Sequence, residues 1–373
     1  MEHKSAKKVD IITIHFGTNH GSVLQAYALS NYLNSVGCEA EIIDYVPKRY
    51  KIWNALLLKK GKLYPLPVLL AYYPIAVIKS IRVRKIFERF LKKNLNLTRK
   101  YSTSIQLRER PPKADIYISG SDQVWNNDYN GDKDNSYFLD FVGGNGKKIA
   151  YAASFGKEEI SDSEYLYKIK PMLKSFNKIS VRESDALNIL GKIGVESTHV
   201  VDPVFLLSKE QWTDFANDFK TTEPYILVYV MDGLYSELLD CAHKIKEETG
   251  NSIYVVSFRK IKDSRIDKCF HLANPKDFVG LINNASAVVT NSFHGTAFSV
   301  LFQKNFITIG KKMYNSRMIS LLNKLLLQKH FIPTGENHSI EKINFAIKRE
   351  NNDSENILQK WIADSKEFIN KLL

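Results

Sequence analysis

Cysteine is scarce in this sequence, and the few cysteines present form no pattern. The 373 residues contain three, Cys38, Cys241 and Cys269, which are far apart, odd in number and not spaced as metal ligands. A disulfide framework and a zinc site are therefore not expected, and a reducing compartment suits the chain. The first ten residues are polar and lead directly into a strand pattern, so we expect no signal peptide and a cytoplasmic location.

Acidic residues are nearly absent from one segment. Residues 48–100 contain 15 Lys and Arg but a single acidic residue, Glu88, whereas the rest of the chain has 38 basic and 39 acidic residues. The net charge of +13 therefore arises in this segment alone. This distribution argues against a generally basic nucleic-acid-binding protein and favours one local contact with an anionic partner.

The same segment lacks an apolar run of membrane-spanning length. Residues 63–78 are 16 uncharged residues, but Pro65, Pro67 and Pro74 interrupt them, and a spanning helix needs about 20 apolar residues. A basic helix over 82–93 follows, with apolar side chains available on one face (Ile81, Ile86, Phe87, Phe90 and Leu91). Such an insertion can lie on the inner face of an anionic membrane. It can equally pack on its own domain or form a dimer contact.

The rest of the chain alternates between strand and helix patterns. Residues 10–14 predict a strand, 23–33 a helix and 41–45 a second strand, with Gly17 and Gly21 in the first loop. The glycine spacing matches neither the dinucleotide fingerprint nor a P-loop. The loop can offer backbone N–H groups to a phosphate or carboxylate, or it can be a tight turn only. Both interpretations stay open.

Polar side chains follow two more strands of the first half. Asp122 comes shortly after a strand over 115–119, and Arg182 lies at the end of a strand over 178–183. Asp122 can instead cap a turn, and Arg182 can pair with Glu183 for structural reasons. Residues 199–207 predict a further strand that leaves the first domain.

The second half repeats the pattern, with strands at 225–231, 252–258, 287–289 and 305–309. His294 lies between the third of these strands and a helix, at the carboxyl edge of a parallel sheet where ligands bind. The pattern therefore predicts an α/β protein with domains at 1–215 and 216–373 and a cleft between them. We expect the insertion at about 48–100 in the first domain, and the final helix can pack back on that domain.

Six motifs together resemble the polysaccharide pyruvyl transferase family. Each motif is weak alone, but their order and combination are specific; they are Gly17–Leu29, Gly120–Asn126, Ser180–Glu183, Asp202–Leu207, Ser292–Gly295 and Asn315–Arg317. The resemblance implies two Rossmann-like domains in a GT-B-like arrangement. It also implies a transferase that moves a pyruvyl group from phosphoenolpyruvate to two hydroxyls of a sugar, leaving a pyruvate ketal on a cell-surface polysaccharide precursor such as an exopolysaccharide or capsule.

The resemblance and the chemistry of the donor assign roles to particular residues. His294 is the candidate general acid or phosphate ligand, Arg317 and Arg182 bind the donor's anionic groups, and Asp122 is a candidate base for a sugar hydroxyl. Ser292, Gly295 and Thr296 are expected to line the donor pocket, and the expected acceptor-side residues are Gly17, Asn19, Gly21 and Ser121. Several members of the family carry an arginine where this chain has Ser292, and Arg317 and Arg182 are candidates to replace its charge.

The expected partners follow from this assignment. They are phosphoenolpyruvate as the donor substrate and a sugar acceptor, of which a lipid-linked repeat unit is one form; no metal, organic cofactor or nucleic acid is expected. Two rival functions remain, a GT-B glycosyltransferase that uses a nucleotide sugar and a catalytically inactive carbohydrate-binding relative. The sequence leaves the oligomeric state open.

Overall fold

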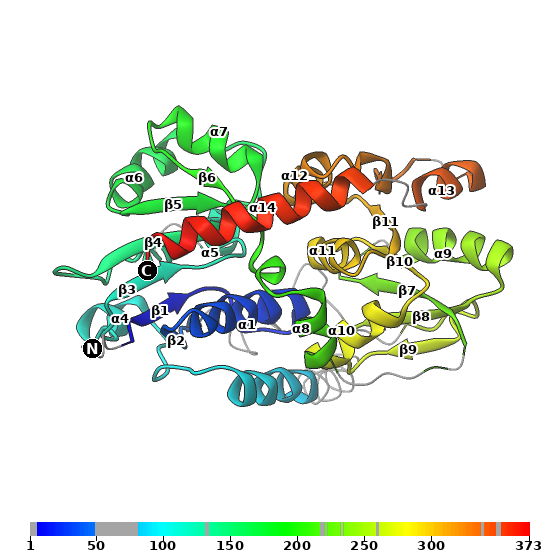
Figure 1. The fold of residues 1–373 in the computed structure, drawn as a ribbon, viewed down its shortest axis with the longest axis horizontal. Helices are drawn as coiled ribbons and strands as arrows, with labels where there is room; N and C mark the ends of the chain where they lie inside the picture. Colours follow the sequence, from blue (N-terminus) through cyan, green and yellow to red (C-terminus); the bar gives the residue numbers. More distant parts are fainter. Residues whose placement is uncertain are drawn as a thin grey trace, which may run out of the picture.

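The protein is described here by a computed structural model. The structure describes residues 6–48, 81–130, 134–216, 221, 223–231, 233, 235–258, 261–336, 339–347 and 352–373. The apolar run at 63–78 and the remainder of 49–80 lie outside the described residues. Two parallel sheets lie side by side along the long axis of the molecule (Figure 1).

The first sheet is built from residues before position 200. Its six described strands have the order β2-β1-β3-β4-β5-β6 and all pair in parallel. The strands are β1 (Lys8–Ile12), β2 (Glu39–Ile42), β3 (Ile116–Ser119), β4 (Lys147–Ala153), β5 (Lys178–Val181) and β6 (Thr198–His199). Its helices are α1 (His20–Ser35), α4 (Ser104–Glu109), α5 (Asn127–Asn130), α6 (Ser163–Lys174) and α7 (Ser184–Lys192), with the 3₁₀ turn η2 (Ser136–Phe138).

The second sheet begins at residue 225. Its six described strands have the order β12-β11-β10-β7-β8-β9, which is the strand order of a doubly wound nucleotide-binding fold. The strands are β7 (Tyr225–Val230), β8 (Ser252–Ser257), β9 (Lys268–Phe270), β10 (Ala287–Thr290), β11 (Asn305–Ile309) and β12 (Phe331–Ile332). The helices of this half are α9 (Tyr235–Thr249), α10 (Pro275–Asn284), α11 (Phe293–Leu301), α12 (Ser316–Lys324) and α13 (Ile340–Ile347), with η4 (Gln328–His330).

The predicted strand over 199–207 is wrong for most of its length. Strand β6 ends at His199, and Pro203–Leu206 form the 3₁₀ turn η3. The side chain of Asp202 accepts a hydrogen bond from the Val204 amide at 3.0 Å and so caps this turn. An aspartate followed by proline favours a turn over a continuing strand, and this local signal prevails over the apolar run.

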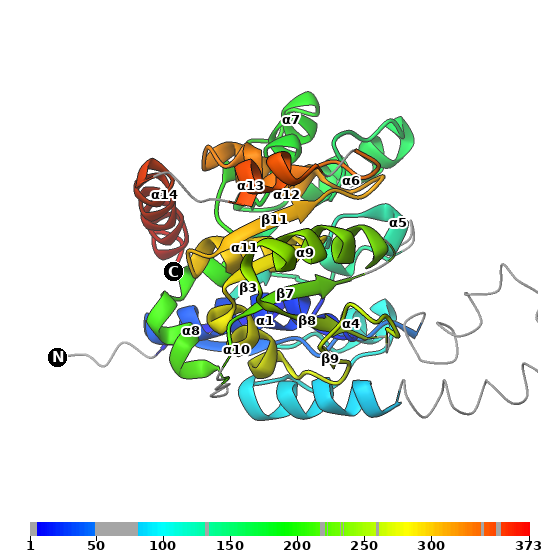
Figure 2. The same ribbon diagram turned by 90° about the vertical axis from the view of Figure 1, so that its right-hand side faces the viewer.

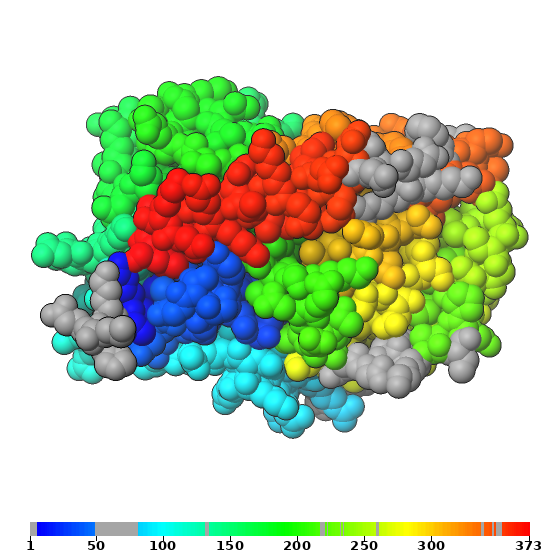
Figure 3. All heavy atoms as spheres, viewed as in Figure 1, coloured from blue at the N-terminus to red at the C-terminus, as the bar shows by residue number. Residues whose placement is uncertain are grey.

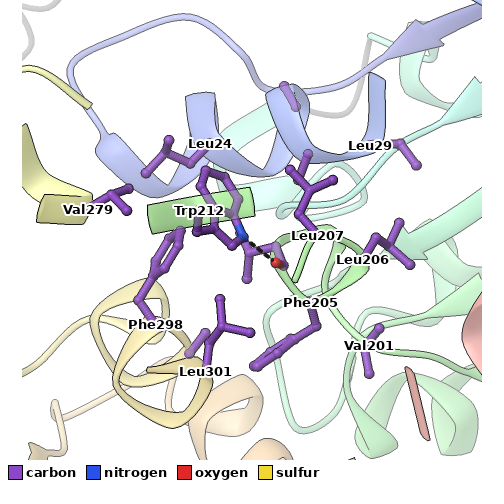
Figure 4. Close-up of a cluster of buried hydrophobic side chains, with 14 of the residues drawn as sticks. Leu24, Leu29, Val201, Phe205, Leu206, Leu207, Trp212, Val279, Phe298 and Leu301 are labelled. Carbon is purple, nitrogen blue, oxygen red and sulfur yellow. Dashed lines mark hydrogen bonds between the residues drawn. The ribbon is translucent and has the colours of Figure 1, made fainter. Parts of the chain in front are cut away.

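A continuous apolar core joins the two halves. Trp212, on helix α8 (Lys209–Phe215), packs among leucines of α1 and the side chains of Val279 and Phe298 from the second half (Figure 4). The Trp212 indole N–H donates to the Val204 carbonyl oxygen at 2.8 Å. Because interiors of this kind are closely packed, the shared core fixes the relative position of the two sheets.

Helix α14 (Asn352–Asn370) runs across both halves (Figures 1 and 3). Near its start Glu355 accepts a hydrogen bond from Gln303, which follows α11, at 2.8 Å. Further along, the Ser365 hydroxyl accepts from the Val201 amide at 3.0 Å, and near the end Asn370 accepts from Tyr32 of α1 at 2.9 Å. The helix therefore clamps the second half to the first.

The described end of the basic insertion packs on the protein itself. Residues 81–94 are helical and lie beside α1 (Figures 1 and 2). The Phe87 ring lies 5.2 Å from the His20 ring and 5.8 Å from the Phe258 ring, and Phe90 contacts Tyr27. The predicted apolar face is thus used within this molecule. No helix in the described ranges combines the length and apolar character that a membrane crossing requires.

Candidate functional site

The candidate site lies where the carboxyl-end loops of the two sheets meet. The first half contributes loops that follow β1, β3, β5 and β6, and the second half contributes the first turns of α11 and α12. In doubly wound sheets, ligands bind at the carboxyl ends of strands beside the point where the strand order reverses. That point lies between β1 and β3 in the first sheet and between β7 and β10 in the second.

Asp202 holds Arg182 in place. Its Oδ2 accepts a hydrogen bond from Arg182 Nη1 at 2.7 Å and another from Ser121 Oγ at 3.0 Å. Both Asp202 and Arg182 are buried. A charge-assisted hydrogen bond is strong in such a low-dielectric setting, so the guanidinium is fixed at the end of β5.

Asp122 connects the loop after β3 to both arginines. Its Oδ2 accepts a hydrogen bond from Ser22 Oγ of α1 at 2.5 Å. Its Oδ1 lies 3.6 Å from Arg182 Nη2 and 3.7 Å from Arg317 Nη1. Asp122 has a φ of 77°, a left-handed conformation that aspartate tolerates better than most residues. The loop geometry thereby brings one carboxylate between two guanidinium groups.

His294 lies in the first turn of α11 and is held between the two halves. Its Nε2 lies 3.7 Å from Asp202 Oδ2, which is too long for a hydrogen bond, so the contact is electrostatic. The ring packs directly on the backbone of Gly21 in α1, because a Cβ atom on Gly21 would come within 1.9 Å of His294 Nδ1. Only glycine fits at this contact.

Phe293 supports the two arginines from the second half. The Arg182 guanidinium lies 4.7 Å from the centre of the Phe293 ring, and the Arg317 guanidinium lies 5.7 Å from it. Cations are attracted to the face of an aromatic ring. We use the name junction cluster for the five charged or titratable residues at this place, Asp122, Arg182, Asp202, His294 and Arg317.

The electrostatics of the junction cluster keep its carboxylates ionised. Burial alone would raise the pKa values of Asp122 and Asp202, but the nearby cations lower both below their ordinary value. Burial and the neighbouring Arg182 lower the pKa of Arg317. The two arginines are therefore held together by Asp122, and a further anion beside them would relieve their repulsion.

Several buried nitrogen atoms of the junction cluster have no hydrogen-bond partner among the described residues. They are Nε and Nη2 of Arg182, Nε of Arg317 and Nε2 of His294. Buried polar groups are almost always hydrogen-bonded in folded proteins. An anion with several oxygen atoms would satisfy such donors. Within the described ranges, no three or more His, Cys, Asp or Glu residues form a group that could hold a metal ion.

The predicted donor-pocket residues at the start of α11 are bonded within the second half. Ser292 is the N-cap, and its Oγ accepts from the Gly295 amide at 3.4 Å. The Thr296 amide and hydroxyl both donate to the Ser292 carbonyl oxygen at 3.0 Å, and a Cβ on Gly295 would meet Thr290 Oγ1 at 2.4 Å. A role of Ser292, Gly295 and Thr296 in a donor pocket stays a prediction.

The predicted acceptor-side residues separate into two groups. Gly21 and Ser121 contact the junction cluster directly, through His294 and Asp202 respectively. Gly17, with a φ of 98°, and Asn19 shape the turn before α1, where Asn19 Oδ1 accepts from the Gly21 amide at 2.9 Å. Their contact with an acceptor stays a prediction.

Two buried carboxylates at the site were missed from the sequence. Asp202 was placed inside a strand, although the Asp-Pro dipeptide was a turn signal. Glu183 was considered only as a partner of Arg182. Its Oε1 instead accepts from Ser154 Oγ at 2.9 Å and from the amides of Phe155 and Gly156 at 2.9 and 3.0 Å. These hydrogen bonds hold the loop after β4 against the end of β5. Burial raises the pKa of Glu183.

Two Rossmann-like units side by side make up the GT-B fold. The fold is similar to the S. aureus MnaA–UDP co-structure, with a TM-score of 0.52, 11% identity and coverage of 98% of each chain. It is also similar to the glycotransferase of kitacinnamycin, with a TM-score of 0.51, 10% identity and coverage of 99% of each chain. A putative UDP-N-acetylglucosamine 2-epimerase from Listeria monocytogenes has a TM-score of 0.50 at 10% identity, over 95% of this chain and 91% of that one.

A match to a protein-family model identifies the family of this chain. A model of the polysaccharide pyruvyl transferase family matches residues 19–311, and the chain therefore belongs to that family and is a transferase. The match includes every member of the junction cluster except Arg317, which lies just beyond it. A search of the curated proteins found no match.

Proposed function

We propose that this enzyme transfers the pyruvyl group of phosphoenolpyruvate to two hydroxyls of a sugar in a polysaccharide precursor, and that the product is a pyruvate ketal. The observation that carries the proposal is the set of buried nitrogen atoms on Arg182, Arg317 and His294 that make no hydrogen bond to the described residues. Phosphoenolpyruvate carries a carboxylate and a phosphate, and guanidinium groups bind both in forked geometry. Family membership supplies the reaction class.

The position of Arg317 supports its assignment as the substitute for the arginine that Ser292 replaces. Ser292 immediately precedes Phe293, and the guanidinium groups of Arg182 and Arg317 both lie over the Phe293 ring. The donor's negative charge would thus meet two cations close to the family position. The proposal assigns charge neutralisation to these side chains and requires no metal or organic cofactor.

The proposed reaction balances in protons and bonds. A proton from His294 is added to the methylene carbon of phosphoenolpyruvate, and a sugar hydroxyl oxygen bonds to the neighbouring carbon. The bond from that carbon to the phosphate oxygen breaks, and a second hydroxyl closes the ketal ring. Of the two hydroxyl protons, one replaces the proton that His294 gave and the other leaves with phosphate. Asp202 Oδ2 lies 3.7 Å from Nε2 of this ring, so a carboxylate faces the group that makes the transfer.

Asp122 remains the candidate base for the hydroxyl. Its lowered pKa makes it a weak base near neutral pH. Its contacts with Ser22 and both arginines give it a second proposed role, in which it positions the two guanidinium groups.

The test is donor-dependent release of product. We expect inorganic phosphate to be released from phosphoenolpyruvate only when a sugar acceptor is present. We expect Arg317→Ala to raise the donor KM about 10- to 100-fold, because one charge-assisted contact is lost. Arg108→Ala, which removes an exposed arginine paired with Asp140, is the matched control and should leave that KM unchanged. Release of a nucleoside diphosphate from a nucleotide sugar would instead identify a glycosyltransferase, and no turnover with any donor would favour a binding role.

A lipid-linked acceptor would bring the enzyme to a membrane surface, and we propose that the basic helix at 81–94 makes this contact. Its outward face carries exposed cations at Arg82, Lys85, Arg89, Lys92 and Lys93, and each cation near an anionic surface contributes about 1 kcal/mol. Lys85→Glu with Arg89→Glu should then release the protein from phosphatidylglycerol vesicles. Lys168→Glu with Lys174→Glu on α6 is the control. Equal release by both pairs would remove the helix from this role.

A further inference from the structure

Two tyrosines from opposite halves meet at the rim of the junction cluster. The ring centres of Tyr129, in α5, and Tyr314, in the loop before α12, are 6.0 Å apart with an interplanar angle of 40°. Tyr129 is 44% exposed and the adjacent Met313 is 60% exposed. We use the name tyrosine rim for Tyr129, Met313 and Tyr314.

The tyrosine rim borders the proposed donor site. Tyr314 lies three residues before Arg317, and Tyr129 is one of the groups that act electrostatically on the Arg317 guanidinium. Tyr129 belongs to the same loop region as Asp122, and its amide donates a hydrogen bond to the Asn126 carbonyl oxygen at 3.2 Å. A molecule that lies on the rim would therefore reach toward the junction cluster from the solvent side.

The structure holds Tyr314 in an uncommon conformation. Its φ is +68°, a left-handed conformation that is unusual for a bulky residue. The Tyr314 hydroxyl donates to Asp128 Oδ2 at 2.9 Å, and Lys157 Nζ contacts Asp128 Oδ1 at 2.9 Å. These contacts fix the ring of the second half against the loop of the first. Strain of this kind in an exposed loop is typical of functional sites.

We propose that the tyrosine rim is a binding subsite for a pyranose ring of the acceptor. This inference rests on the proposed function for the identity of the site that the rim borders. One face of a pyranose presents C–H groups, whose hydrogens are attracted to the negative face of an aromatic ring. The polar side chains beside the rim, Asp128, Asn127 and Lys157, supply acceptors and donors for sugar hydroxyls, since a carboxylate keeps free lone pairs after two contacts.

The subsite also explains why the rim is built from both halves. The sugar hydroxyls must reach the donor carbon at the junction cluster, so the acceptor must lie across the boundary between the two units. A ring stacked on Tyr129 and Tyr314 would span that boundary. Stacking on the two tyrosine rings binds a sugar ring without distinguishing the positions of its hydroxyls. The adjacent polar side chains would therefore determine which sugar is selected.

Binding is tested without turnover by saturation-transfer NMR. The probes are the methyl glycosides of glucose, galactose and mannose, added to the full-length protein without phosphoenolpyruvate. We expect at least one glycoside to receive saturation on its ring C–H protons. Tyr129→Ala and Tyr314→Ala should each raise its dissociation constant about fivefold, which is ~1 kcal/mol. No transfer to any glycoside with the parent protein would overturn the proposal.

Matched variants separate stacking from a structural effect. Tyr129→Phe and Tyr314→Phe keep the rings and should keep most of the affinity. Tyr167→Ala removes a tyrosine that is 84% exposed on α6 and should change nothing. If Tyr314→Phe loses as much as Tyr314→Ala, the bond to Asp128 and not the ring is responsible, and the stacking proposal is wrong.

Kinetics keep this inference distinct from the proposed function. When the parent releases phosphate from phosphoenolpyruvate, Tyr129→Ala should raise the acceptor KM and leave the donor KM unchanged. An unchanged acceptor KM in an active enzyme would overturn the tyrosine rim alone. Binding of the glycosides without any use of phosphoenolpyruvate would overturn the proposed donor and leave the rim as a sugar site. Saturation of UDP in place of the glycosides would identify a nucleotide subsite and overturn the rim proposal.

Discussion

Two buried histidines lie in the first turns of the two helices that meet at the junction, yet their surroundings differ in kind. His20, the first residue of α1, enters the second half, where its ring stacks on Phe278 and Phe258 at 4.7 and 5.0 Å. Its Nε2 contacts the Ala273 carbonyl oxygen at 2.9 Å and its Nδ1 contacts the Tyr229 hydroxyl at 3.3 Å. Burial lowers the pKa of His20 to about 4, so the ring is neutral and fully engaged.

His294 also crosses between the halves, but in the other direction, and its neighbours are charged. It extends from the second half onto Gly21 of the first and faces the ionised Asp202, and its Nε2 makes no hydrogen bond within the described part of the chain. Both histidines are followed by glycine and both lie in the first turn of a helix after a strand. Both side chains are buried, so the neighbouring groups must account for any difference in role. Aromatic rings and a carbonyl oxygen surround His20, which indicates a structural role. Carboxylates and arginines surround His294, which suits a role in the reaction.

Replacing each histidine in turn is the strongest test of whether the two differ in role. His294→Asn should reduce kcat about 10³-fold, because general acid catalysis contributes on the order of 10²–10⁴, with little change in Tm. His20→Asn should lower Tm and keep most of the turnover. Steady-state kinetics and thermal unfolding of both variants measure the two effects. If both variants lose activity equally at unchanged Tm, the histidines do not differ in role.

The contact of His294 with Gly21 gives the next largest effect. Gly21→Ala places a methyl group where the imidazole lies, so the ring must move or the helices must separate. We expect turnover to fall on the order of 100-fold, since small misplacements of a catalytic group have effects of that size. Gly191→Ala, in α7 with open space around it, is the control. Full activity in Gly21→Ala would show that the position of His294 is not critical.

The carboxylate that distinguishes the surroundings of His294 can be neutralised. Asp202→Asn should leave Arg182 without its charged partner and destabilise the protein by about 3–5 kcal/mol, as breaking a buried ion pair does. Turnover should fall on the order of tenfold or more, because His294 loses the charge that faces its Nε2 and Arg182 loses its charged anchor. Urea unfolding and kinetics check both parts. A variant with parental stability would contradict the anchoring role of Asp202.

The smallest effect on turnover is expected from His20→Phe, which tests the pH dependence of stability. The folded pKa of His20, about 4, lies below its ordinary value of 6.5. As pH falls from about 6.5 toward 4, the unfolded chain takes up a proton that the folded chain refuses, and roughly 3 kcal/mol of stability is lost. His20→Phe should lack this loss in urea unfolding compared between neutral and acidic pH. His243→Gln, at a half-buried histidine of α9, should keep it. An unchanged pH profile in His20→Phe would contradict the neutral, buried state of His20.

The sequence predicted the fold well because its signals were local. Apolar runs marked the strands at 10–14, 225–231 and 305–309, and helical periodicity over 23–33 marked α1, so an alternating α/β fold followed. The exception was residues 199–207, where the cap formed by Asp202 ended the strand. The insertion helix was undecided because its apolar positions suit a membrane, a partner or a core, and only tertiary packing placed Phe87 and Phe90 inside.

The site was less predictable because its contacts are far apart in the sequence. The partners of Asp202 come from positions 121, 182 and 294, and no spacing rule relates them. His20 and His294 have similar sequence surroundings. They are distinguished only by long-range contacts, that of His294 with Gly21 and that of His20 with Phe278. The hydroxyls of Ser292 and Thr296 form hydrogen bonds in the first turn of α11. A strand-to-helix pattern in the sequence does not reveal such bonds.

The most direct measurement is the binding of phosphoenolpyruvate by calorimetry, which needs no acceptor. If the junction cluster is the donor site, the parent protein should bind phosphoenolpyruvate, Arg317→Ala should weaken binding at least about tenfold, and Arg108→Ala should not. Equal affinities in all three proteins, or no binding of phosphoenolpyruvate where a UDP-sugar binds, would contradict the assignment of the junction cluster as the donor site.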